Sequence, residues 1–341
     1  MSATPVAAAA APAVPRLGRP GLVVIGLFTL CLLAAFGTMG LGAVRVPQPH
    51  AIEALFGHGT PDQVRTIRDY ELPRILIAFL VGIGLGVSGG VIQGLTRNAL
   101  AAPDTIGVVK GAALGAVILL LAYPRAALSY LPLAAFVGGI AAMAVVYLVA
   151  FRHGGTTPVR LVLVGVAVSA FCESVIRYVM LHEAKGIGQA LVWLSGSLAS
   201  IDMQSVYQIL PWIGVLTPLL ALFVYKLDVM GLGDDMAAGL GVPVEWTRRI
   251  TLVIAVLLAS ACVSVAGSII FVSLISPQIA RRLVGSRHGL LLPAAGAIGS
   301  LILLVSDAIG RGADAPIELP AGMVAAIIGA PYFVYLLMRK L

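Results

Sequence analysis

Charged side chains are scarce in this sequence. Only 11% of the 341 residues are Asp, Glu, Lys or Arg, whereas a soluble domain carries about 25%. Hydrophobic residues make up 60% of the chain, and there are 39 glycines. A soluble globule of this length could not hide so much apolar surface. The composition therefore excludes a soluble enzyme, a nucleic-acid-binding protein and a disordered chain, and it leaves a helical protein that crosses a membrane several times.

Residues suited to chemistry are also few. The three cysteines, Cys31, Cys172 and Cys262, lie in apolar runs without Cys-x-x-Cys spacing, so we expect neither a disulfide framework nor a metal site. The five histidines form no His-Glu-x-x-His motif, and none of the four lysines precedes Ser or Thr as in a Walker A loop. We therefore expect no catalytic site, metal or cofactor on this chain. Uphill transport would need an ion gradient or a partner ATPase.

Long apolar runs fill most of the chain. A spanning helix needs about 20 apolar residues, and the uncharged run Ile250–Ala280 is too long for one span, with Gly267 as its natural break. The short alternating strands of a membrane barrel are absent. We expect an all-α protein: a disordered tail, residues 1–20, and one transmembrane domain, residues 21–341. The ten predicted spans are Gly21–Val44, Pro73–Leu95, Thr105–Tyr123, Tyr130–Phe151, Val159–Leu181, Ser205–Tyr225, Trp246–Ala266, Ser268–Ala280, Gly289–Ile309 and Pro320–Met338.

Basic residues are distributed unevenly between the predicted loops. If the N-terminus lies inside, 13 Lys and Arg residues fall in the inner segments and 7 in the outer ones. Because cytoplasmic loops are enriched in Lys and Arg, we expect both termini in the cytoplasm. The net charge of +7 is then mostly a signature of the inner loops, and it does not indicate a nucleic-acid partner.

Glu173 and Arg177 are ionisable residues within a predicted span. Their spacing of four puts them on one helix face, in the favourable acid-first order. Ionisable residues in spans often mark a solute path, but a self-neutralised pair that extends toward the headgroups also fits. Lys110 presents the same two alternatives nearer the cytoplasm. An ion-coupled carrier usually needs conspicuous buried acids, and Glu173 is the only good one here.

Five groups of short motifs lie in order along the chain. Each alone is a weak signal, but their order and spacing together resemble the FecCD-type permease family of bacterial ABC importers for iron–siderophores, haem and cobalamin. The resemblance runs from about residue 45 to the C-terminus. The motifs are Leu72–Arg74 with Gly86–Gln93, Arg97–Pro103 and Ile106–Gly107; Trp193–Leu198; Leu232–Asp235 with Leu240–Gly241; Ala266–Leu274 with Pro277 and Ala280–Arg282; and Asp307 with Arg311, Glu318–Gly322 and Gly329–Pro331.

This resemblance implies a type II ABC-importer permease fold of ten spans in the bacterial inner membrane. It also implies a second permease subunit, identical or different, two cytoplasmic ATPase subunits that hold ATP and Mg²⁺, and an extracytoplasmic solute-binding protein. The favoured substrate is a ferric siderophore. Haem or cobalamin within the same family, and an ion-coupled secondary carrier from another class, are the alternatives.

The resemblance assigns a role to the segment of residues 230–241, between the sixth and seventh predicted spans. In the family, this segment forms short coupling helices that contact the ATPase, which implies such a contact for Gly233, Asp234, Asp235, Leu240 and Gly241. The residues themselves predict short helices punctuated by glycines. Two acids at a helix start also have a simpler explanation, because the helix dipole favours them there.

Family positions also suggest a gate and a translocation path. Asn98 and Leu100 match a cytoplasmic gate, although Ala99 stands where the family usually has Pro. A polar and a bulky residue at a constriction can close it by packing and dewetting. Gln93, Glu173 and Arg177 are the candidates for lining the path.

On the outer side, Arg74 and Arg311 match family arginines that dock the binding protein. Glu71 occupies a position that is often Arg, and Arg68 is the candidate substitute. Gln278 stands where the family usually has His, after Pro277, and the sequence offers no account of that difference.

Overall fold

The computed structural model describes residues 19–41, 46–123, 127–152, 155–182, 186–199, 201–313 and 318–338. The predicted tail, residues 1–20, lies outside the described residues except for its last two positions. The described parts of the chain form helices and no named strand, apart from one isolated bridge between Arg152 and Gly155.

The elements follow one another in a simple order. They are α1 (Pro20–Thr38), α2 (Gln48–Leu55), α3 (Pro61–Arg65), the π-helix η1 (Thr66–Glu71), α4 (Leu72–Thr96), α5 (Val108–Ala122), α6 (Ala127–Ala150), α7 (Pro158–His182), α8 (Ile187–Leu194), α9 (Met203–Ala221), α10 (Val224–Met230), α11 (Asp234–Gly239), α12 (Val244–Ala266), α13 (Phe271–Val284), α14 (His288–Gly312) and α15 (Ala321–Met338).

The predicted all-α fold is confirmed, and each of the ten predicted spans overlaps a helix of the structure. Within the described residues, six helical stretches are long and apolar enough to cross a membrane, and α9 and α10 form a seventh that is bent by 57°. The other three, α5, α13 and α15, are shorter. The break predicted at Gly267 is also present, because α12 ends at Ala266 and Gly267 has a φ of +74°.

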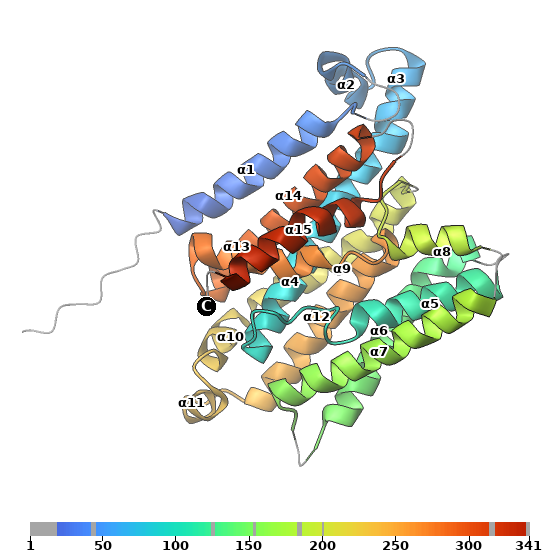
Figure 1. Cartoon of the computed structure of the whole chain (residues 1–341). Helices are drawn as coiled ribbons and strands as arrows, with labels where there is room; N and C mark the ends of the chain where they lie inside the picture. Colours follow the sequence, from blue (N-terminus) through green and yellow to red (C-terminus); the bar gives the residue numbers. More distant parts are fainter. Residues whose placement is uncertain are drawn as a thin grey trace, which may run out of the picture.

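Helix α4 lies at the centre of the bundle and packs against α14, α13 and α12 (Figure 1). Its glycines permit this close approach. A Cβ atom at Gly82, Gly86 or Gly89 would overlap the backbone of α14 or α13. Small residues that let helix backbones touch are the usual means of packing in membranes, where apolar burial between helices gains little.

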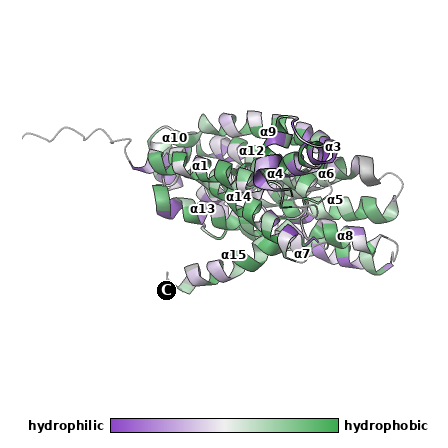
Figure 2. Ribbon diagram, turned by 90° about the horizontal axis from the view of Figure 1, so that it is seen from above, coloured by the Kyte–Doolittle hydropathy of each residue, from purple (hydrophilic) through white to green (hydrophobic). Residues whose placement is uncertain are grey.

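The helix directions define two ends of the bundle. Helix α4 runs from η1 to Arg97, and α14 runs antiparallel beside it, so Leu72 and Gly312 lie at one end and Arg97 and His288 at the other. Figure 1 shows α2 and α3 at the first end and α11 at the second, and Figure 2 shows apolar residues along the long helices between them. Both views also place α7 and α15 on the same side of the molecule.

Candidate functional site

The segment between α10 and α12 forms the short helices that its glycines predict. Helix α10 ends at Met230, and α11 occupies only six residues between two turns. Gly233 and Gly241 adopt φ values of +117° and +81°. Side chains other than glycine rarely take such values, so these two residues fix where α11 begins and ends.

Asp234 binds two arginines rather than capping its own helix. Its Oδ1 accepts from Nη2 of Arg97 at 2.7 Å, and its Oδ2 accepts from Nη2 of Arg248 at 2.6 Å. No side chain caps α11 at its N-terminus. Asp235, the next acid, is exposed. The simpler explanation by the helix dipole therefore accounts for Asp235, whereas Asp234 has specific partners from α12 and from the residue that follows α4.

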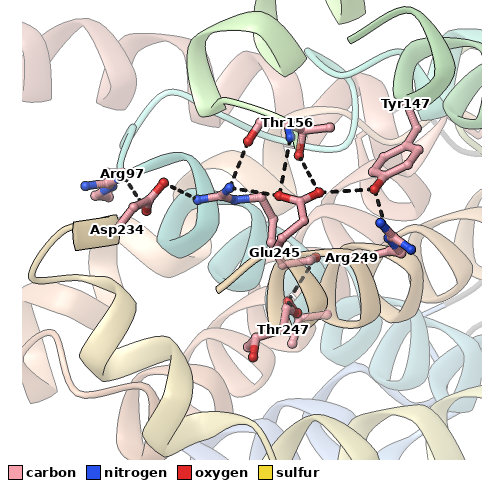
Figure 3. Close-up of polar contacts among 9 residues, drawn as sticks. Arg97, Tyr147, Thr156, Asp234, Glu245, Thr247 and Arg249 are labelled. Atoms are coloured by element: carbon pink, nitrogen blue, oxygen red, sulfur yellow. Dashed lines mark hydrogen bonds and ion pairs between the residues drawn. The ribbon is translucent and has the colours of Figure 1, made fainter. Parts of the chain in front are cut away.

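A polar network continues from Asp234 into the bundle (Figure 3). Nη1 of Arg248 donates to the carbonyl of Thr156 at 2.8 Å, and the Arg248 side chain is only 3% exposed. Glu245 pairs with Arg248 and accepts from the Thr156 amide and from the hydroxyl of Tyr147. Nε of Arg249 donates to the same hydroxyl at 2.9 Å. This network fixes the α11–α12 junction to α6 and to the connection before α7.

Three apolar side chains of this segment are exposed. Leu232 before α11, Met236 within it and Leu240 at its C-terminus are 64%, 62% and 62% exposed. Helix α11 lies at the end of the bundle rather than along its length (Figure 1). An exposed apolar patch with a polar rim is typical of a protein contact. The family resemblance implies an ATPase contact for Leu240 but not for Leu232 or Met236, which the sequence does not single out because apolar residues are common throughout the chain.

The candidate gate residues lie in the loop between α4 and α5, close to this network. Oδ1 of Asn98 accepts from the Leu100 amide at 2.9 Å, and Leu100 is 43% exposed. Gln278, for which the sequence offered no role, donates to the Ala99 carbonyl at 2.5 Å and to Oε1 of Gln93 at 3.1 Å. Gln278 therefore attaches α13 to the candidate gate loop. Gln93 is buried within the chain beside it.

The structure brings Lys110 to the pair predicted on α7. Nζ of Lys110 lies 2.7 Å from Oε2 of Glu173, and Nε of Arg177 lies 3.2 Å from Oε1. The Arg177 side chain is 75% exposed. Asp104, in the loop before α5, is near this group; burial raises the pKa of its carboxyl, and the charge of Lys110 partly opposes that shift. Lys110 of α5 and Arg177 of α7 therefore share the Glu173 carboxylate.

The candidate docking arginines are not on the surface. Arg74 and Arg311, which match the docking arginines of the family, are buried at the end opposite α11. The physical reason is charge compensation inside the chain. Arg74 binds Asp307 at 2.8 Å and Glu318 at 2.7 Å, while Arg311 binds Glu71 and Asp307. The docking role stays a prediction, and in this structure both guanidinium groups are bound by acids of the same chain.

Glu71 and Arg68 occupy different surroundings at that end. Glu71, which stands where the family often has Arg, completes the buried ion group as a partner of Arg311. Arg68 lies outside the ion group and donates from Nε to the Leu55 carbonyl at 3.0 Å. Arg68 is therefore the one candidate docking residue that the structure leaves at the surface. Among the described residues, no group of three or more His, Cys, Asp or Glu side chains could hold a metal ion.

Several known proteins are similar to this chain over most of its length. The Fe(3+)-citrate import system permease protein YfmE of Bacillus subtilis (strain 168) is 40% identical over 319 residues, 94% of this chain and 95% of the relative. The Fe(3+) dicitrate transport system permease protein FecD of Escherichia coli (strain K12) is 38% identical, over 93% of this chain and 99% of the relative. A solved structure of a metal-chelate type ABC transporter in an inward-facing conformation matches with a TM-score of 0.83 and 28% identity, covering 94% of this chain and 99% of that one.

The fold and these similarities define the class of protein: a multi-pass membrane permease of the ABC-importer type. The model of the FecCD transport family matches residues 28–339, and the chain belongs to that family. The family resemblance seen in the sequence motifs is therefore confirmed.

Proposed function

We propose that this chain is the permease subunit of an ATP-driven importer for ferric siderophores. It forms the translocation path, and it carries no catalytic site of its own. The observation that supports this proposal most directly is the exposure of the apolar side chains Leu232, Met236 and Leu240 in a segment that the Asp234–Arg248 pair attaches to α12. Relatives named as iron-citrate and iron-hydroxamate permeases favour a ferric chelate as the substrate.

The α11 surface is the proposed contact for a cytoplasmic ATPase. Apolar side chains in the centre of a contact and acids at its rim are the usual anatomy of a protein interface. Here the three apolar residues supply the centre, and Asp235 lies at the rim. Gly233 and Gly241 set the limits of the helix that presents them. Two such ATPase subunits, each with ATP and Mg²⁺, would serve a pair of permeases.

This contact also implies an orientation. The α11 end would face the cytoplasm of a bacterial cell, with both termini on that side of the inner membrane. The excess of Lys and Arg in the corresponding loops supports the same orientation. The opposite end, with α2, α3 and Arg68, would then receive the extracytoplasmic binding protein.

The proposed path follows the face of α7 and α15, against a second permease subunit. Arg177 is largely exposed on α7. A charged side chain directed into lipid is costly, and such residues usually face protein or a water-filled cavity. Since α7 and α15 lie on one side of the bundle (Figure 2), the path would run between this face and its counterpart on the partner. Glu173 and Arg177 would line it, whereas Gln93, the third candidate, is buried and hydrogen-bonded to Leu274 and Gln278 of α13.

Uptake by whole cells tests the function. Cells that lack this chain would receive either the wild type or the double variant Leu232→Asp, Met236→Asp, and accumulation of ⁵⁵Fe-siderophore, ⁵⁵Fe-citrate, haem and cobalamin would be measured. The proposal expects the wild type to restore uptake of a ferric chelate and the double variant not to do so, at equal amounts of membrane-inserted protein.

Two results would contradict the proposal. Restored uptake of haem or cobalamin alone would reassign the substrate within the family. Uptake that continues without any partner ATPase, but stops when the proton or sodium gradient is collapsed, would indicate an ion-coupled carrier.

A further inference from the structure

Asp234 joins the segment that carries the exposed apolar surface directly to the candidate gate loop. Its contact with Arg97 connects residues that are 137 positions apart in the sequence. Arg97 immediately precedes Asn98, the first residue of the candidate gate. The pair therefore spans the distance from α11 to the gate with one hydrogen-bonded contact of 2.7 Å (Figure 3).

The two partners of Asp234 differ in how firmly they are held. Arg248 is almost completely buried and has further contacts with Thr156 and Glu245. Arg97 is 38% exposed, and Asp234 is the partner of its guanidinium group. One carboxylate oxygen therefore anchors α11 to the bundle, whereas the other binds a group that can follow a movement.

The backbone of Arg97 is adapted to this contact. Its φ of 50° makes it the one residue other than glycine, among those described, with a left-handed conformation. That position terminates α4, where glycine or asparagine is usual. Glycine would relieve the backbone but would leave no side chain to reach α11. The contact of its guanidinium group with Asp234 explains why an arginine occupies this strained position.

A displacement of Arg97 has a short route to the gate. The Asn98 side chain holds the Leu100 amide, and Gln278 holds the Ala99 carbonyl from α13. The loop from Arg97 to Leu100 is thus a hydrogen-bonded turn with an attachment at each side. A movement imposed on Arg97 reorients this turn rather than being lost in a flexible loop.

We propose that the Arg97–Asp234 ion pair transmits the movement of α11 to the gate at Asn98 and Leu100. This inference rests on the proposed function, in which an ATPase moves α11. Arg97 and Asp234 are positioning residues that touch neither nucleotide nor substrate. Asp234 keeps α11 docked on Arg248, and Arg97 carries the displacement into the loop.

The test uses the complete transport complex in proteoliposomes, with the substrate established for the wild type. Arg97→Gln removes the charge of the cation while the Asp234–Arg248 contact remains. We expect uptake to fall about tenfold. ATP hydrolysis stimulated by the loaded binding protein should stay within about twofold of the wild-type rate, because the ATPase still hydrolyses ATP but no longer moves the gate. Arg97→Lys keeps the charge and should recover part of the uptake.

Two comparisons separate this link from general damage. Arg287→Gln makes the same chemical change as Arg97→Gln at an exposed arginine of the same end of the bundle, and we expect it to leave the ratio of uptake to hydrolysis unchanged. Arg97→Gly relaxes the backbone and should uncouple as Arg97→Gln does. If Arg97 and Asp234 act through one pair, the double variant Arg97→Gln, Asp234→Asn will lose no more coupling than Asp234→Asn alone.

A thiol probe reads the gate itself. The three native cysteines are buried, so Leu100→Cys introduces one accessible site. Its labelling rate should change between the nucleotide-free and vanadate-trapped complexes, and Arg97→Gln should abolish that change. Coupled uptake by Arg97→Gln at the wild-type level, or an unaltered change in labelling, would overturn the link. A wild-type complex that transports no ferric chelate would instead overturn the proposed function on which the link rests.

Discussion

Five charged side chains from separate stretches of the chain meet at the end opposite α11. Asp307 binds both Arg74 and Arg311, while Glu318 binds Arg74 and Glu71 binds Arg311. Removing one member of a buried ion group is expensive because its partner is left uncompensated. An exposed pair contributes little. The position of each acid, rather than its charge, should therefore decide how much the protein loses without it.

Asp307→Asn and Glu318→Gln test this difference. Asp307 is fully buried between two guanidinium groups, so its replacement should cost about 3 kcal/mol. Glu318 is half-buried and binds Arg74 alone, so we expect less than about 1 kcal/mol. The thermal midpoint of the detergent-solubilised protein measures both. Equal shifts for the two variants would show that the buried group does not hold α4 and α14 together.

Arg177→Gln tests the proposed path at the same scale. Loss of this cation leaves Lys110 as the one ion-pair partner of Glu173 among the described residues, and it removes a positive charge from α7. An anionic ferric chelate should then be taken up several-fold more slowly, with the amount of protein unchanged. Arg287→Gln, an exposed arginine at the α11 end, is the matched control. Equal uptake by the two variants would show that Arg177 does not line the path.

At the scale of elements, helix packing depends on glycines that a residue with a Cβ atom cannot replace. A Cβ atom at Gly89 would overlap the Ser273 carbonyl of α13, whereas a Cβ atom at Gly26 of α1 would meet nothing within 4 Å. Gly89→Ala should therefore cost about 1–3 kcal/mol, because backbone must shift. Gly26→Ala should be neutral or slightly stabilising. Thermal midpoints and folded yield distinguish them, and a harmless Gly89→Ala would contradict the close packing of α4 on α13.

The elements are also where the sequence was most informative. Each run chosen by hydropathy overlaps a helix, and Gly267 marks the break between α12 and α13, because both signals are local. The sequence did not predict the contacts of Asp234 with Arg97 and of Arg311 with Glu71, because these residues are 137 and 240 positions apart. Family position alone did not show that Arg74 and Arg311 are buried. Asp307 lies four residues before Arg311 on α14, but the other acidic contacts depend on packing between distant segments.

At the scale of the whole molecule, the ten predicted spans would put both termini on the same side of the membrane. The proposed ATPase contact on α11 and the excess of basic residues in the predicted inner loops favour the cytoplasm as that side. Fusions with alkaline phosphatase, which is active only outside the cytoplasm, test the arrangement. We expect activity from an insertion at Gly59, between α2 and α3, and none from a fusion after Leu341 or an insertion at Gly239.

The insertion at Gly239 in α11 is the critical one, because α13 is short, and the number of spans before any later position depends on whether α13 crosses the membrane. Activity at Gly239 would place α11 outside the cell and would remove the ATPase contact, whereas activity at the C-terminus alone would show that α13 does not cross the membrane.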